Sequence, residues 1–190
     1  MQLLDELQSV KFSLTDITYE MLDPNRLRDL NVALSEALAR QRLSKIDGIE
    51  FLKVPITAGQ YTLKRRAGDI TFEDPQKHSQ RQIGALEEIF TYKNTHFGLE
   101  VKSAAPFGYV GLDFPNMTPK IETHLQLLLE TFGPETQLLL CFPFSRDSEQ
   151  KVRKKVQDYP KVICYDLNYT KEELKRQMEY ILGANTRKIK

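Results

Sequence analysis

Two side chains of opposite charge, Glu100 and Lys102, lie two residues apart in the stretch FGLEVKSA, residues 97–104. The stretch alternates apolar and polar residues, which predicts a β-strand, and residues i and i+2 of a strand project from one face. A carboxylate beside an ammonium can bind a cation and stabilise charge on a phosphate. The ordinary alternative is a solvated ion pair, which contributes about 0–1 kcal/mol to stability.

A second acidic pair, Glu87 and Glu88, opens the preceding apolar segment, and Glu88 precedes Glu100 by 12 residues. The segments EIFTY and HFGLEVKS flank residues 93–95, which we interpret as a hairpin turn. Folding the chain there brings the acidic end of the first strand towards Glu100. Two carboxylates with a lysine nearby are typical of a Mg²⁺ or Mn²⁺ site, because Mg²⁺ takes oxygen ligands and keeps several waters.

The segment LEEIFTYKNTHFGLEVKS resembles the active-site hairpin of the PD-(D/E)xK nuclease superfamily, in particular that of archaeal Holliday-junction resolvase-type nucleases. In that hairpin an acidic residue opens one strand, and a hydrophobic–Glu–x–Lys motif lies on the next. The segments that follow, EVKSAAPFGYVGLDFPN, PKIETHLQLLLETFG and PETQLLLCFPF, are similar to the family's loop, helix and buried strand. The resemblance covers about residues 84–144 and implies a restriction-endonuclease-like fold.

The resemblance also implies roles for individual residues. Glu88 and Glu100 take the places of two metal-binding acids, and the backbone carbonyl of Val101 adds a contact to the metal. Lys102 takes the place of the lysine that orients the attacking water and stabilises the transition state. The implied cofactor is Mg²⁺ or Mn²⁺. The family's first acid is typically an Asp after Pro, whereas here Glu87 precedes Glu88, so Glu87 is an alternative first ligand.

Structural roles are expected of the other acidic residues and of the histidines. Some family members add a glutamate from an early helix, and Glu36 is the candidate here, but its helical position places it opposite the apolar face. Asp69 and Asp74 lie beside Gly68 and Pro75, where turn roles are favoured. A surface or capping role is expected of the three histidines, which share no ligand spacing: His78, His96 and His124.

A run of three basic residues, Lys64, Arg65 and Arg66, forms a local cationic patch. It predicts either contact with nucleic-acid phosphates or a solvated face. The net charge of the chain is only +1, so a role with nucleic acid must depend on such local patches. The partner implied by the resemblance is nucleic acid, with DNA favoured over RNA, and nucleases of this fold often form homodimers to cut two strands.

The elements that must position these residues alternate between helix and strand. Leucines at helical spacing predict helices over residues 3–10 and about 24–43, and residues 49–72 are rich in strand signals. The apolar runs QLLLCF and KVICYDL are typical of parallel strands buried on both faces. A polar helix is expected from about Ser148. Thr118 and Pro119 predict the start of a helix that ends at Gly133, and Gly183 is expected to end the last helix.

Together these elements predict one α/β domain over residues 1–190: a helical N-terminal region, about 1–45, and a mixed-sheet core flanked by helices, about 46–183. Cys141 and Cys164 lie in apolar runs, which fits reduced thiols and a cytoplasmic location, and no apolar run approaches the ~20 residues of a membrane span. The sequence favours a Mg²⁺- or Mn²⁺-dependent endonuclease that hydrolyses phosphodiester bonds. The alternative is a non-catalytic α/β interaction module or an inactive member of the fold.

Overall fold

The computed structural model describes residues 24–76, 82–102, 114–142, 156–167 and 170–187. The predicted helix at residues 3–10 lies outside this part of the chain, as does most of the polar helix expected from Ser148. The described elements, in chain order, are α3 (Pro24–Ser44), β1 (Ile49–Phe51), β2 (Ile56–Ala58), β3 (Tyr61–Arg66), β4 (Asp69–Glu73), β5 (Gln82–Leu86), β6 (Glu88–Tyr92), β7 (Thr95–Val101), α4 (Phe114–Phe132), β8 (Gln137–Phe142), β9 (Val162–Asp166) and α6 (Lys171–Arg187).

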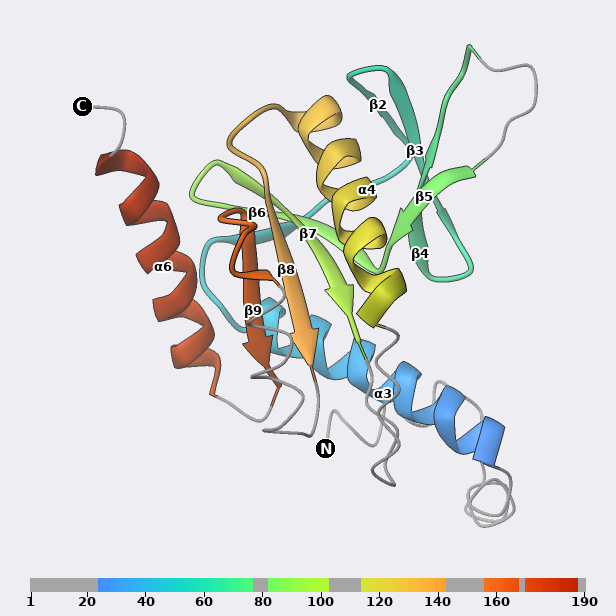
Figure 1. Cartoon of the computed structure of the whole chain (residues 1–190), viewed down its shortest axis with the longest axis horizontal. Helices are drawn as coiled ribbons and strands as arrows, with labels where there is room; N and C mark the ends of the chain where they lie inside the picture. The colour runs from blue at the N-terminus through green and yellow to red at the C-terminus, as the bar shows by residue number, and fades with distance from the viewer. Residues whose placement is uncertain (1–23, 77–81, 103–113, 143–155, 168–169, 188–190) are drawn as a thin grey trace.

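The strands form two sheets (Figure 1). The larger sheet has five strands in the order β1-β6-β7-β8-β9, in which β1, β6 and β7 pair antiparallel and β7, β8 and β9 pair parallel. The smaller sheet is an antiparallel meander of four strands, β2-β3-β4-β5. The predicted mixed sheet with flanking helices is therefore confirmed, as are the parallel pairing and burial of the two apolar runs.

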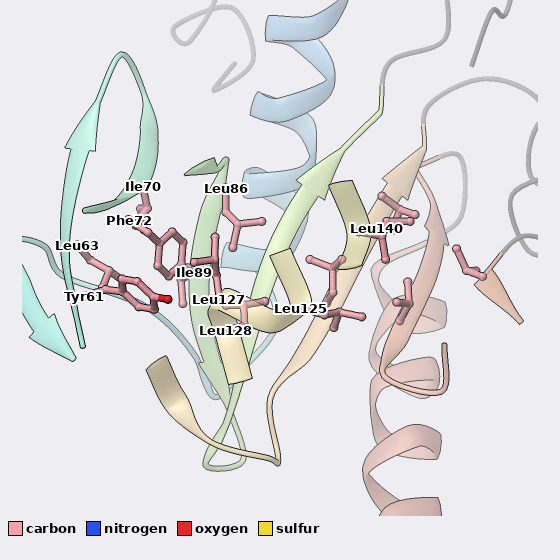
Figure 2. Packing of buried hydrophobic residues seen from close by; sticks show 14 of the residues in the cluster. Tyr61, Leu63, Ile70, Phe72, Leu86, Ile89, Leu125, Leu127, Leu128 and Leu140 are labelled. Atoms are coloured by element: carbon pink, nitrogen blue, oxygen red, sulfur yellow. The ribbon is translucent and has the colours of Figure 1, made fainter. Parts of the chain in front are cut away.

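Side chains of the larger sheet pack into two clusters on its two faces. One face is covered by α4 and the smaller sheet, as Figure 2 shows with leucines of α4 between strands of both sheets. The other face is covered by α3 and α6. Along β7, the residues Phe97, Leu99 and Val101 belong to the α3 and α6 face, so the alternate residues Gly98 and Glu100 face α4.

The hairpin between β6 and β7 turns through two residues. Lys93 and Asn94 have φ angles of +48° and +63°, and Tyr92 pairs directly with Thr95. Positive φ at both central residues is the geometry of a type I′ turn, whose twist matches that of the flanking strands. The predicted hairpin is confirmed, but the predicted three-residue turn over 93–95 is wrong by one residue, because Thr95 already belongs to β7.

Strand β5 was not predicted from the sequence. It contains Gly84, which weakens a strand pattern, but the glycine has a packing reason. A Cβ atom at Gly84 would lie 2.5 Å from Leu127 Cδ1, so the missing side chain lets α4 pack against this strand. A single residue, Glu87, then separates β5 of the smaller sheet from β6 of the larger one.

Two predicted helix ends are corrected. Helix α4 begins at Phe114, before the predicted start, because Pro115 occupies the first turn, where no backbone N–H is needed, and the helix continues through Pro119. It ends as predicted at Gly133, whose φ of +89° gives the left-handed conformation of a helix end. Gly183 does not end α6, which runs on to Arg187, because Gly183 has no positive φ.

Two further sequence expectations can be compared with the described residues. Cys141 and Cys164 are both buried free thiols, as predicted. None of the described helices combines the length and the apolar character that a membrane crossing requires.

Candidate active site

The two-residue turn decides which acidic residue faces Glu100. Because Tyr92 pairs with Thr95, Glu88 pairs with Leu99 and shares the face of that leucine. Glu100 projects from the opposite face, towards α4. A three-residue turn would have paired Glu88 with Glu100, but the observed register separates them and places Glu87 at the end of the hairpin nearest Glu100. The structure therefore does not bring Glu88 and Glu100 together.

Glu88 forms ion pairs on the face of the larger sheet that α3 covers. Its side chain is only 7% exposed, and Arg65 Nη2 lies 2.7 Å from Glu88 Oε1. Arg40 Nε of α3 lies 3.7 Å from the other carboxylate oxygen. Arg40 also donates a hydrogen bond of 2.8 Å from Nη2 to the backbone carbonyl of Glu87. These contacts make Glu88 a link between α3, β3 and β6.

Glu100 is 1% exposed and is surrounded by cationic and polar partners. Lys102 Nζ contacts Oε1, Lys120 Nζ lies 3.0 Å from the same oxygen, and His124 Nδ1 lies 3.2 Å from Oε2. Burial alone would raise the pKa of Glu100, but His124, Lys102 and Lys120 outweigh it and hold the pKa well below the ordinary 4.5. The Glu100–Lys102 pair is therefore not the solvated pair of an exposed strand face.

Glu87 lies across the same pocket and has very different surroundings. Burial raises its pKa well above 4.5, and the negative charge of Glu100 raises it further. Among the described residues its Oε2 atom is buried without a hydrogen-bond partner. An unpaired buried carboxylate oxygen is unfavourable unless a ligand satisfies it. Glu87 is thus an acceptor prepared for a proton or a cation.

The pocket has a volume of about 420 Å³ and lies between α4 and the junction of the two sheets. Three acidic residues contribute to its wall: Asp69, Glu87 and Glu100. The lining residues from α4 are Pro119, Lys120, Thr123 and His124. The pocket therefore combines carboxylate oxygens from both sheets with an ammonium and an imidazole from the helix.

Two acidic residues that the sequence assigned elsewhere belong to this electrostatic environment. Burial raises the pKa of Glu36 although Arg40 lowers it, and the charges of Asp69 and Glu100 raise it further. Burial likewise raises the pKa of Asp69, with Arg40 opposing and Glu100 adding to the effect. Glu36 is partly buried and forms an ion pair with Arg40, whose Nη1 lies 3.9 Å from Glu36 Oε2, so a role for Glu36 in the site stays a prediction.

Helix α4 contributes functional candidates that the sequence analysis missed. Lys120 was not considered, and His124 was expected at the surface or in a cap but is 3% exposed in the pocket wall. The available signal was their spacing of four residues, which places both on one helix face. Of the other histidines, His96 stacks on Phe132 with ring centroids 4.3 Å apart, and His78 lies outside the described residues.

The predicted cationic patch is engaged in ion pairs within the chain. Lys64 Nζ lies 2.8 Å from Glu73 Oε2, Arg66 contacts the other oxygen of Glu73, and Arg65 binds Glu88. All three basic side chains nevertheless remain 40–52% exposed, so their contact with nucleic acid stays a prediction.

The remaining predicted positions lie where strand and turn chemistry places them. Val101 ends β7 beside Cys141 of β8, and the backbone N–H of Lys102 donates to the Cys141 carbonyl at 2.8 Å. The Val101 carbonyl contact with metal stays a prediction. Asp74 accepts a hydrogen bond of 2.9 Å from the backbone N–H of Gln76, which is the turn role expected of it.

The donor set restricts which metals the pocket suits. Within the described ranges, no three Asp, Glu, His or Cys side chains form a cluster that could hold a metal ion by themselves. A fully protein-bound zinc site is therefore not present in this part of the chain. Mg²⁺ differs, since one or two carboxylates suffice when waters and substrate phosphate complete its coordination. Glu87, with its unpaired Oε2, and Glu100 fit that requirement.

No protein-family model and no curated protein matches the chain. The crystal structure of an XisH family protein from Nostoc punctiforme PCC 73102 is similar at a TM-score of 0.43 and 14% identity, over 70% of this chain and 91% of that one. The crystal structure of an FdxN element excision controlling factor protein from Anabaena variabilis is similar at a TM-score of 0.42 and 15% identity, with the same coverage of both chains. Similarity at this level does not establish a shared function.

Proposed function

We propose that the chain is a Mg²⁺- or Mn²⁺-dependent nuclease that hydrolyses phosphodiester bonds in nucleic acid, with DNA favoured over RNA. The observation that carries this proposal is the pocket whose wall contains both Glu87 and Glu100, with Lys102 in contact with Glu100. In this proposal Glu87 and Glu100 hold the cation, and Glu88 holds the hairpin against α3 and β3. The proposal keeps the roles implied by the resemblance, except that Glu87 replaces Glu88 as the first metal-binding acid.

The unpaired oxygen of Glu87 supports a cation at this position. Burial and the negative charge of Glu100 raise the pKa of Glu87, whereas two lysines contact the carboxylate of Glu100 directly. A divalent cation would give the Glu87 Oε2 atom a partner. At Glu100 it would replace part of the positive charge that the two lysines provide. Bound there, Mg²⁺ or Mn²⁺ supplies Lewis-acid stabilisation of the phosphate charge.

The residues of the chain supply position and charge. Lys102 lies 21% exposed at the end of β7, held by its backbone hydrogen bond to β8 and by its contact with Glu100. Its ammonium can orient an attacking water and stabilise negative charge that develops on the phosphate. Glu100 is buried in the protein interior, where the effective dielectric constant is lower than in water, which strengthens these charge interactions.

A non-catalytic interaction module is the second candidate, and one observation favours it. Glu100 already has Lys102, Lys120 and His124 as partners, and no described cluster of three ligand side chains exists. In this second proposal the charges around Glu100 form a structural network that holds α4 on the sheet, and the protein neither binds metal nor cuts nucleic acid.

Cleavage assays distinguish the two proposals. The assay compares wild type with Lys102→Ala and with a control, Lys171→Ala, which replaces an exposed lysine of α6. Each protein is incubated with plasmid, branched DNA or single-stranded RNA in the presence of Mg²⁺ or Mn²⁺. We expect Lys102→Ala to fold but to cut about 10²–10³-fold more slowly, the effect of removing one pre-organised electrostatic group. If wild type cuts none of the substrates, or if Lys102→Ala cuts as fast as wild type, the nuclease proposal is wrong.

A further inference from the structure

Lys120 brings a second ammonium group to Glu100. Its Nζ lies 3.0 Å from Glu100 Oε1, the same oxygen that Lys102 contacts. The two lysines differ in exposure: the side chain of Lys120 is 52% exposed, whereas that of Lys102 is 21% exposed. Lys120 lies on α4 and lines the pocket.

The position of Lys120 conflicts with a cation bound at Glu100. A divalent cation that contacts Oε1 would meet the Lys120 ammonium as a like charge at contact distance, and like charges repel. Lys102 directly follows β7 and is mostly buried, whereas the side chain of Lys120 is 52% exposed, so its ammonium can move into water at a smaller cost. Of the two lysines that contact Glu100, Lys120 is therefore the one that we expect to move when a cation binds.

We propose that Lys120 is the residue of this site that binds the substrate phosphate, and that it leaves Glu100 for a phosphate oxygen when a divalent cation occupies Glu100. This inference rests on the nuclease function proposed above. A phosphodiester that enters the pocket with the cation offers the departing ammonium an anionic partner. A lysine serves this role as a point charge without demanding a fixed fork geometry.

The exchange predicts two effects of opposite sign when the Lys120 charge is removed. Metal binding in the absence of nucleic acid should tighten at least about fivefold, the lower limit for losing one charge contact in water. Duplex binding should weaken only when the cation is present, because without the cation Lys120 is engaged with Glu100. With the cation, the salt dependence of duplex binding should fall by about one phosphate contact.

The test compares Lys120→Gln, the charge-conserving Lys120→Arg and the distant control Lys171→Gln. Calorimetry measures Mn²⁺ binding to each protein alone, and fluorescence anisotropy measures binding of a short DNA duplex and its RNA counterpart with and without Mn²⁺. We expect Lys120→Gln to bind Mn²⁺ more tightly and the duplex more weakly in Mn²⁺, while Lys120→Arg and Lys171→Gln resemble wild type.

The outcomes separate this inference from the proposed function. If Lys120→Gln binds Mn²⁺ as wild type does, or loses duplex affinity equally with and without Mn²⁺, the role of Lys120 is wrong while the nuclease proposal stands. If wild type binds no Mn²⁺, the nuclease proposal and this inference both fall.

Discussion

Replacing Glu87 and Glu88 in turn should separate metal binding from stability. Glu88→Gln removes the carboxylate that Arg65 and Arg40 contact at 2.7 and 3.7 Å. A hydrogen bond to a charged group contributes about 1.5–3 kcal/mol, but both arginines are 31–41% exposed and solvent screens the loss. We therefore expect about 1–2 kcal/mol of destabilisation, a fall in melting temperature of roughly 2–8 °C for a chain of this size. Mn²⁺ binding should be retained.

Glu87→Gln should have the reverse effect. In the unfolded chain Glu87 ionises near pH 4.5, whereas burial and Glu100 hold its proton to higher pH in the folded chain. Wild type therefore loses stability as the pH rises from 4.5 through the folded pKa. Glu87→Gln removes this loss, so it should match wild type in acid and exceed its stability at neutral pH. Its Mn²⁺ affinity should fall because one of the two carboxylates is gone.

Urea unfolding between pH 4 and 8 and calorimetric titration with Mn²⁺ measure both effects on the same samples. Each variant serves as the control for its neighbour, since the substitutions are chemically identical and one residue apart. Loss of Mn²⁺ binding in Glu88→Gln with binding kept in Glu87→Gln would refute our interpretation of the hairpin register and restore the assignment from the sequence.

Two further predictions concern the same face of the sheet. Glu100→Gln should abolish Mn²⁺ binding measured by calorimetry, and an affinity equal to that of wild type would exclude Glu100 as a ligand. Gly98→Ala should destabilise the fold by about 1–3 kcal/mol in urea unfolding, because the new Cβ would lie 2.6 Å from Leu128 Cδ1 and 2.8 Å from Leu86 Cδ1. Gly183→Ala, whose Cβ meets no atom within 4 Å, is the matched control and should be neutral or stabilising.

The fold was predictable wherever a local pattern coincides with burial. The continuous apolar run of β8 and the leucine periodicity of α4 gave the right element types. Strand β5 was missed because Gly84 carries no strand signal, and its reason for being glycine is a contact with Leu127, more than 40 residues away in sequence. Gly133 and Gly183 look alike in sequence, but only Gly133 adopts the positive φ that ends a helix.

Only part of the candidate site could be predicted from the sequence. The motif identified Glu100 and Lys102, but the choice between Glu87 and Glu88 depends on whether Thr95 belongs to the turn or to the strand. A one-residue shift exchanges the two faces of a strand, so a small error at the turn moves a carboxylate to the wrong side of the sheet. Lys120 and His124 could not be assigned from the sequence, because their proximity to Glu100 depends on how α4 docks.

Glu87 occupies the single position between β5 and β6, so it belongs to neither sheet and joins one to the other. A ligand that bound Glu87 and Glu100 together would therefore link this junction to β7 and stabilise the contact between the smaller sheet and the larger one. Part of its binding free energy would appear as resistance of that contact to opening. Amides of β2 and β3 would then exchange hydrogen more slowly in the liganded protein, although neither strand lines the pocket.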